Sequence, residues 1–358
     1  MPFNQNPEVI GNVVKIFILV TFASVFAIVL TPFLTHFLYK YRLWKKEPRL
    51  KAITGEEAPV LYELHKEREV TIPRFGGLLI CGTTFFVAVL FFLVSQISDN
   101  FWAQKLNFLS RSQTWLPLFT LVAASIVGFF DDLLQVFGKG RYIAGGLSFT
   151  RRLFLVILIG LIGAWWFYFK LEWDTIKIPF FGDFSIGLWY IPFFVIVMLA
   201  SWSGGVIDGL DGLAGGVFAS MFGAFTIISL VLGKIDLASF SAVITGTILA
   251  FLWFNIPPAR FYMGETGMLG LTTTLAVVSF LTDSVLVLPI IGGLLVVESG
   301  SVILQLLSKK IRKKKIWLST PIHHHFEARG WPSYKVTMRF WLIGIVLATI
   351  GVVIRLLG

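Results

Sequence analysis

Two adjacent carboxylates, Asp131 and Asp132, lie near the end of an apolar segment in "GFFDDLLQV". Adjacent carboxylates repel each other, and one tends to keep its proton unless a cation lies between them. An aspartate at a helix C-terminus also opposes the helix dipole, so a solvated helix end is the less favourable interpretation. The pair therefore indicates a bound Mg²⁺ ion or a proton-transfer step.

Two further aspartates, Asp208 and Asp211, occur in the glycine-rich stretch "SGGVIDGLDGLAGG". Glycines permit unusual backbone geometry and let a ligand approach closely. Asp211 is equally well explained as the N-cap of the helix that follows. Ligand binding and capping both stay open on these residues alone.

The stretch "FNIPPARFYMGETGMLG" holds Glu265 just before another apolar segment. The exposed N–H groups of a helix N-terminus favour anions at this point. Tyr262 offers a flat face for a nucleobase, although aromatic residues are also common at membrane edges. Asn255 fits a cap at the end of the preceding helix.

Three consecutive histidines, His323, His324 and His325, lie in "STPIHHHFEARGW". Imidazoles bind transition metals, but consecutive side chains do not converge on one ion in a helix or a strand. Donors to phosphate oxygens, or to a uracil or sugar, are the better interpretation.

The elements that must position these residues are apolar. Of the 358 residues, 56% are hydrophobic and only 14% are charged, well below the charged fraction of a soluble domain. Runs long enough to cross a bilayer recur along the chain, and the single cysteine, Cys81, excludes an internal disulfide. We predict an all-α integral membrane protein forming one domain over residues 1–358, with about ten transmembrane helices. The predicted spans are 12–39, 76–96, 115–136, 151–169, 187–205, 213–233, 237–256, 267–282, 284–307 and 338–357.

Most lysines and arginines lie in alternate loops, such as "KYRLWKKEPRLK" and "KKIRKKK". The positive-inside rule places these loops in the cytoplasm and both termini outside. The formal charge of +10 then reflects basic loops and contacts with membrane lipids rather than nucleic acid. Alternating residues near 171–187 predict a short external β-hairpin.

With this topology, all four polar motifs lie at the cytoplasmic side. Acids at membrane edges mark functional sites, and Mg²⁺ is commonly held by one or two carboxylates beside substrate phosphates. We therefore expect an enzyme with a Mg²⁺ site and a phosphorylated substrate at the inner membrane surface. An ion-coupled transporter is the alternative, but transporter sites lie near the midplane on broken helices.

The motifs "GFFDDLLQV", "DGLDGLAGG", "FNIPPARFYMGETG" and "PIHHHFEARGW" resemble, in order and spacing, the phospho-N-acetylmuramoyl-pentapeptide transferases of bacterial cell-wall synthesis. The likeness covers nearly the whole chain and includes "VVESGSVILQ" and "RFWLIG". It implies a multi-pass protein of the bacterial inner membrane with a Mg²⁺-dependent cytoplasmic site. Such enzymes transfer phospho-MurNAc-pentapeptide from its UDP-linked form to undecaprenyl phosphate, giving lipid I and UMP, and the resemblance also implies a homodimer.

The resemblance implies roles for particular residues. Asp131, Asp132, Glu265 and His323 would be catalytic, and the first three would also hold the metal. The substrate-binding residues would be Asp208, Gly209, Leu210, Asp211, Asn255, Tyr262, Gln305, His324, His325, Lys139 and Lys66.

Several positions depart from the family pattern. The metal-ligand position is usually aspartate but is Glu265 here, and the usual asparagines before "DGLDG" are replaced by "SWSGGVI". In the first loop, "LHKEREVTIPRFGG" leaves His65, Lys66 and Arg68 as alternatives for the basic role. A related transferase that uses UDP-N-acetylglucosamine is the alternative function, although its histidine motif differs.

Overall fold

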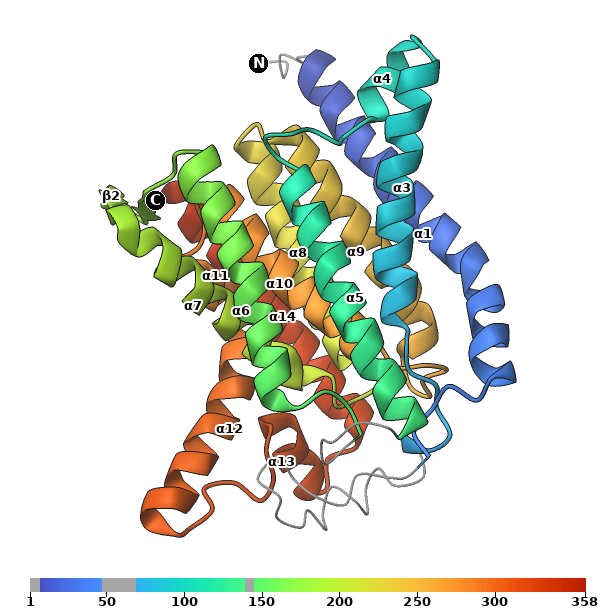
Figure 1. The fold of residues 1–358 in the computed structure, drawn as a ribbon, viewed down its shortest axis with the longest axis vertical. Helices are drawn as coiled ribbons and strands as arrows, with labels where there is room; N and C mark the ends of the chain where they lie inside the picture. The colour runs from blue at the N-terminus through green and yellow to red at the C-terminus, as the bar shows by residue number, and fades with distance from the viewer. Residues whose placement is uncertain (1–6, 47–68, 139–144) are drawn as a thin grey trace.

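The computed structural model describes residues 7–46, 69–138 and 145–358, and it is almost entirely helical (Figure 1). Within these ranges, nine helical stretches are long and apolar enough to cross a membrane. The chain is therefore an all-α, multi-pass membrane protein, as predicted. The nine stretches are α1 (Pro7–Lys40), α3 (Gly77–Ile97), α5 (Trp115–Phe137), α6 with the π-helix η1 (Phe149–Lys170), η2 with α7 and η3 (Gly187–Ile207), α8 (Leu213–Val231), α9 (Ile235–Asn255), α10 (Gly264–Leu281) and α14 (Ser333–Leu357).

Helix α10 lies at the centre of the bundle, and nearly every residue in it is buried. It packs most extensively against α5 and also contacts α3 and α7. Threonine hydroxyls along the helix, such as those of Thr272 and Thr273, donate to carbonyls one turn earlier. These polar groups are thereby satisfied in an environment without water. The residues at the start of α10 are consequently held in a rigid setting.

Glycines allow the close approach of helices to the start of α10. A Cβ placed on Gly77 of α3 would lie 2.0 Å from the backbone nitrogen of Gly267. A Cβ on Gly128 of α5 would lie 2.1 Å from the carbonyl oxygen of Glu265. Small residues of this kind let helix backbones pack tightly in a membrane.

The predicted ninth span, 284–307, is not one continuous helix. It is divided into α11 (Leu288–Ile291) and α12 (Gly293–Arg312), separated at Gly292. Helix α12 runs away from the bundle in Figure 1, and it is not among the nine candidate spans. The glycine pair at 292–293 permits the break, and the charges of Glu298, Lys309 and Lys310 lower the hydropathy of α12.

The predicted hairpin is present as β1 (Thr175–Ile178) and β2 (Gly182–Ser185), which pair antiparallel. Both described ends of the chain lie at the same end of the bundle as this hairpin (Figure 1). The short helices α4 (Phe101–Leu106) and α13 (Ile322–Ala328) lie at opposite ends, and α13 marks the end where the polar motifs occur.

Two glycines of α3 test the packing around α10. Gly77→Ala should lower the unfolding midpoint in detergent, because overpacking against a backbone costs about 1–3 kcal/mol. Gly82→Ala is the matched control, since a Cβ there meets no atom within 4 Å. Equal midpoints for the two variants in a thermal melt would contradict this packing.

Candidate functional site

The polar motifs meet at the end of the bundle that carries α13. Contacts join the last turns of α5, the loop 208–212 between η3 (Gly204–Ile207) and α8, and the first turn of α10. A Cβ on Gly209 would lie 2.2 Å from Nε2 of His323, so α13 packs directly on the same loop. Segments far apart in the sequence therefore form one polar cluster.

Asp132 anchors the start of α10 and has no exposed surface. Its carboxylate accepts hydrogen bonds from the backbone N–H groups of Glu265 (3.0 Å) and Thr266 (2.9 Å). The Thr266 hydroxyl donates to it at 2.7 Å, and Arg74 Nε donates at 3.2 Å. A carboxylate at a helix N-terminus satisfies unpaired N–H groups and complements the helix dipole. Asp132 therefore fixes the backbone that carries Glu265.

Arg152 connects Asp131 with Glu265. Its Nη1 lies 2.9 Å from Oε1 of Glu265 and 3.6 Å from Oδ2 of Asp131. Asp131 also accepts hydrogen bonds from Gln135 Nε2, at 2.9 Å, and from the backbone N–H of Leu147. The guanidinium therefore balances two carboxylates that would otherwise repel each other.

The carboxylates differ in how well they fit a divalent cation. The oxygens of Asp132 already accept four hydrogen bonds, including one from a guanidinium. Glu265 is partly exposed, with its side chain 25% accessible, and faces Asp131 across Arg152. In the part of the chain that the structure describes, no three His, Cys, Asp or Glu side chains form a metal-binding group. Two carboxylates, Asp131 and Glu265, still suffice for Mg²⁺, because substrate phosphates and water commonly complete its coordination.

Asp208 lies beside the start of α10. Its Oδ2 accepts a hydrogen bond from the backbone N–H of Gly264 at 3.3 Å. Burial raises the pKa of the Asp208 carboxyl to about 6, and the positive charge of Arg74 opposes part of that rise. The loop 208–212 thus brings a fourth carboxyl to the cluster, and burial makes this carboxyl hold its proton more strongly than an exposed aspartate does.

Asp211 and Asn255 connect the loop 208–212 with the segment after α9. Asp211 Oδ2 accepts from the backbone N–H of Ala259 at 3.2 Å. The Asn255 side chain accepts from Gly212 N–H and donates to the carbonyl of Phe261, both at 2.9 Å. Both side chains are buried. These bonds to backbone groups hold the loop in place.

Tyr262 is half-buried beside this loop. Its backbone N–H donates to the carbonyl of Pro73, and its carbonyl accepts from the N–H of Gly76, both at 2.8 Å. The two bonds join the segment 73–76 to the start of α10. Leu210, by contrast, is a buried core residue.

The three histidines of α13 have different neighbours. His323 is fully buried, and its Nδ1 lies 3.0 Å from Oε2 of Glu298 on α12. His324 Nδ1 lies 2.7 Å from Oε2 of Glu327. His325 Nδ1 accepts from the backbone N–H of Leu318 at 3.2 Å. Each ring thus lies beside a different group.

Gln305 organises the loop between α12 and α13. Its Oε1 accepts from the N–H groups of Ile316 (2.8 Å) and Trp317 (3.1 Å), and its Nε2 donates to the carbonyl of Trp317 at 2.9 Å. These three bonds are to the loop backbone, so Gln305 holds the loop in position. The basic residues predicted from the loops, Lys66 and Lys139 together with His65 and Arg68, lie outside the described residues.

Four residues of the cluster were absent from the predicted site. Arg74 and Arg152 pair with the acids, Thr266 bonds Asp132, and Glu298 lies beside His323. Glu298 had a usable signal, because it is an acid inside an otherwise apolar segment. Arg74 and Arg152 lie beside the span starts, where basic residues are expected for topology alone.

Comparison with known proteins identifies the family to which the chain is similar. Residues 114–283, which include Asp131, Asp208 and Glu265, match the model of glycosyl transferase family 4. The chain is 34% identical over 317 residues to the phospho-N-acetylmuramoyl-pentapeptide-transferase of Lactiplantibacillus plantarum, covering 88% of this chain and 92% of the relative. It is 36% identical to the enzyme of that name from Oceanobacillus iheyensis (84% and 87% covered) and 33% identical to that from Rickettsia bellii (98% and 96% covered).

The chain is a membrane-embedded transferase. With this identity over nearly its whole length, the chain belongs to the phospho-N-acetylmuramoyl-pentapeptide-transferase family. The resemblance carried by the four sequence motifs is thereby confirmed.

The pKa of Asp208 predicts a pH dependence of stability. A carboxyl whose pKa is raised in the folded state binds more protons folded than unfolded between pH 4 and its folded pKa of about 6. The contribution of Asp208 to the free energy of unfolding is therefore fully present below about pH 4. It is lost as the pH rises through the folded pKa of about 6. Asp208→Asn should weaken this decline in unfolding midpoints measured from pH 4 to pH 8, and an unchanged pH profile would contradict it.

Two glycines of one segment test the packing of α13. Gly209→Ala should displace His323 and lower transferase activity at least about tenfold, because the added methyl group meets the ring. Gly205→Ala is the matched control, since the nearest atom to its Cβ, in Met268, is 3.9 Å away. Wild-type activity for both variants would show that α13 does not need this contact.

Proposed function

We propose that this chain transfers the phospho-N-acetylmuramoyl-pentapeptide group from its UDP-linked form to undecaprenyl phosphate, producing lipid I and UMP. The observation that carries this proposal is the meeting of Asp131, Asp208 and Glu265, from three separate segments, around Arg74 and Arg152. A cluster of mixed charge at a bundle end suits a substrate whose reacting part is a diphosphate.

The reaction exchanges one pyrophosphate (phosphoanhydride) bond for another. An oxygen of the lipid phosphate attacks the sugar-side phosphorus, a new P–O bond forms, and the bond to the uridine phosphate breaks with UMP as leaving group. Asp131 is the carboxylate suited to orient the lipid phosphate, because it is held by Gln135 and Arg152. Arg74 and Arg152 supply positive charge for the phosphate oxygens.

The proposal includes Mg²⁺, with Glu265 and Asp131 as the protein ligands. Bound Mg²⁺ would neutralise charge that develops on the diphosphate. Asp132 contributes in another way: through its bonds to the first N–H groups of α10, it sets the direction in which Glu265 leaves the backbone.

We assign the nucleotide to the loop 208–211 and its surroundings. Gly209 allows close approach of a ligand or of α13, and Tyr262 offers a ring for the uracil to stack on. Asp211, Asn255 and Gln305 would support this pocket through the backbone bonds described above. His323 and His324, beside Gly209, are the donors nearest the loop.

We place the site at the cytoplasmic face of the bacterial inner membrane. The basic residues Lys309, Lys310 and Arg312 end α12 at the same end of the bundle as α13 (Figure 1). Loops rich in lysine and arginine are retained in the cytoplasm. Both termini would then lie outside.

Release of UMP tests the proposal directly. The purified protein, given Mg²⁺, undecaprenyl phosphate and UDP-MurNAc-pentapeptide, should release UMP, and UDP-N-acetylglucosamine in the same assay should give far less. Release from UDP-N-acetylglucosamine alone would replace the proposed sugar. No release from either nucleotide would overturn the proposal.

Two variants at one position test the carboxylate ligand. Glu265→Gln should lower kcat at least about 100-fold, because a neutral amide is a poor Mg²⁺ ligand. Glu265→Asp should keep part of the activity, since the carboxylate remains. Asp183→Asn, in the hairpin at the other end of the bundle, is the control. Full activity in Glu265→Gln would show that the metal is held elsewhere.

A further inference from the structure

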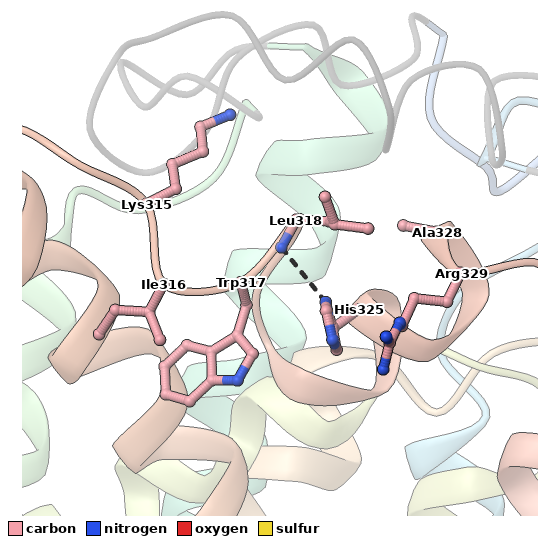
Figure 2. Close-up of a pocket in the computed structure, with 7 residues that line it drawn as sticks. All are labelled: Lys315, Ile316, Trp317, Leu318, His325, Ala328 and Arg329. Atoms are coloured by element: carbon pink, nitrogen blue, oxygen red, sulfur yellow. Dashed lines mark hydrogen bonds between the residues drawn. The ribbon is translucent and has the colours of Figure 1, made fainter.

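A basic pocket lies between the loop segment 315–318 and α13 (Figure 2). It has a volume of about 660 Å³ and is lined by Lys315, Ile316, Trp317, Leu318, His325, Ala328 and Arg329. Figure 2 shows the loop segment 315–318 along one side and the α13 residues along the other. The proposed transferase site described above uses none of these residues except His325.

The walls of this pocket are fixed by hydrogen bonds from both neighbouring helices. Gln305 of α12 bonds the backbone of Ile316 and Trp317, and Ser308 Oγ donates to the carbonyl of Lys314 at 2.9 Å. From the other side, His325 Nδ1 accepts from Leu318 N–H, as the dashed line in Figure 2 shows. The loop is therefore held in one conformation rather than left to solvent.

The charge of the pocket is positive. Lys315 and Arg329 are both exposed, and within the described residues neither makes an ion pair. Among the residues that the structure describes, no acidic side chain lines the pocket. Burial and the nearby guanidinium of Arg329 lower the pKa of the His325 ring. A guanidinium binds carboxylates and phosphates in bidentate fashion, and Trp317 adds an apolar wall.

The two sites share α13 as a common wall. His323 and His324 face Gly209 of the nucleotide loop, and His325, the next residue, faces the pocket. A molecule bound at the diphosphate cluster can therefore continue past α13. A pentapeptide extends to roughly 17 Å, which is enough to cross a helix of about 10 Å diameter.

We propose that this pocket binds the C-terminal carboxylate of the pentapeptide, with Arg329 and Lys315 as its cationic partners and Trp317 against the peptide's apolar side chains. This inference rests on the proposed function, because it assigns one part of the same substrate. It makes the pocket a recognition site for the peptide, separate from the atoms that react.

The test compares substrates as well as variants. The double variant Arg329→Gln with Lys315→Gln is assayed for UMP release with UDP-MurNAc-pentapeptide, with its C-terminal amide, and with UDP-MurNAc that lacks a peptide. Loss of charge-assisted bonds should raise KM for the pentapeptide substrate at least about tenfold, with kcat nearly unchanged. The amide should raise KM of the wild-type enzyme to a similar degree, with little further rise in the variant. KM for peptide-free UDP-MurNAc should not change.

Lys310→Gln is the matched control, because Lys310 is an exposed lysine of the same basic run and does not line the pocket. If the wild-type enzyme releases UMP but the double variant keeps the wild-type KM for the pentapeptide substrate, the pocket assignment is wrong. A rise only in KM for undecaprenyl phosphate would make it a lipid-phosphate site and would also overturn the assignment. Failure of the wild-type enzyme with all substrates would instead count against the proposed function.

Discussion

The carboxylate of Asp132, with no surface open to solvent, accepts hydrogen bonds from two backbone N–H groups and one hydroxyl at the start of α10. This interaction joins the end of α5 to the beginning of the most buried helix of the bundle. It fixes the backbone that carries Glu265. Arg152 then connects the Glu265 carboxylate with that of Asp131. Gly128, whose absent side chain lets α5 approach the Glu265 carbonyl, makes the contact sterically possible. The chemistry of the site therefore depends on a helix cap.

Carboxylates at the edge of a membrane are costly unless cations or hydrogen bonds balance them. Here Arg74 and Arg152 provide that balance within the protein, and α13 closes the cluster by packing on Gly209. The same positive charges suit a diphosphate substrate, because a phosphate can take over bonds that the carboxylates now make. Glu298 Oε2 lies 3.0 Å from Nδ1 of His323 and extends this group of buried polar side chains into α12.

The helical membrane fold could be predicted from the sequence, because apolar runs of bilayer length need no tertiary information. The predicted end of the span 267–282 agrees with the end of α10 at Leu281, and the β-hairpin was recognisable from the alternating residues near 171–187. The break at Gly292 was missed, since hydropathy alone does not distinguish a continuous span from a helix that leaves the bundle.

For the site, the acidic motifs were found as rare charges in an apolar chain, but their partners were not. Arg152 lies 113 residues from Glu265, and only the fold brings them together. Asp211, Asn255 and Gln305 were predicted to bind substrate, and the structure shows them bonded to backbone groups. Whether they also contact substrate stays a prediction. A double-mutant cycle on Asp132→Asn and Thr266→Val measures the helix cap most directly, with unfolding free energy and UMP release as readouts. The account predicts a coupling energy on the order of 1 kcal/mol and a double variant scarcely worse than Asp132→Asn alone, whereas strictly additive losses would contradict it.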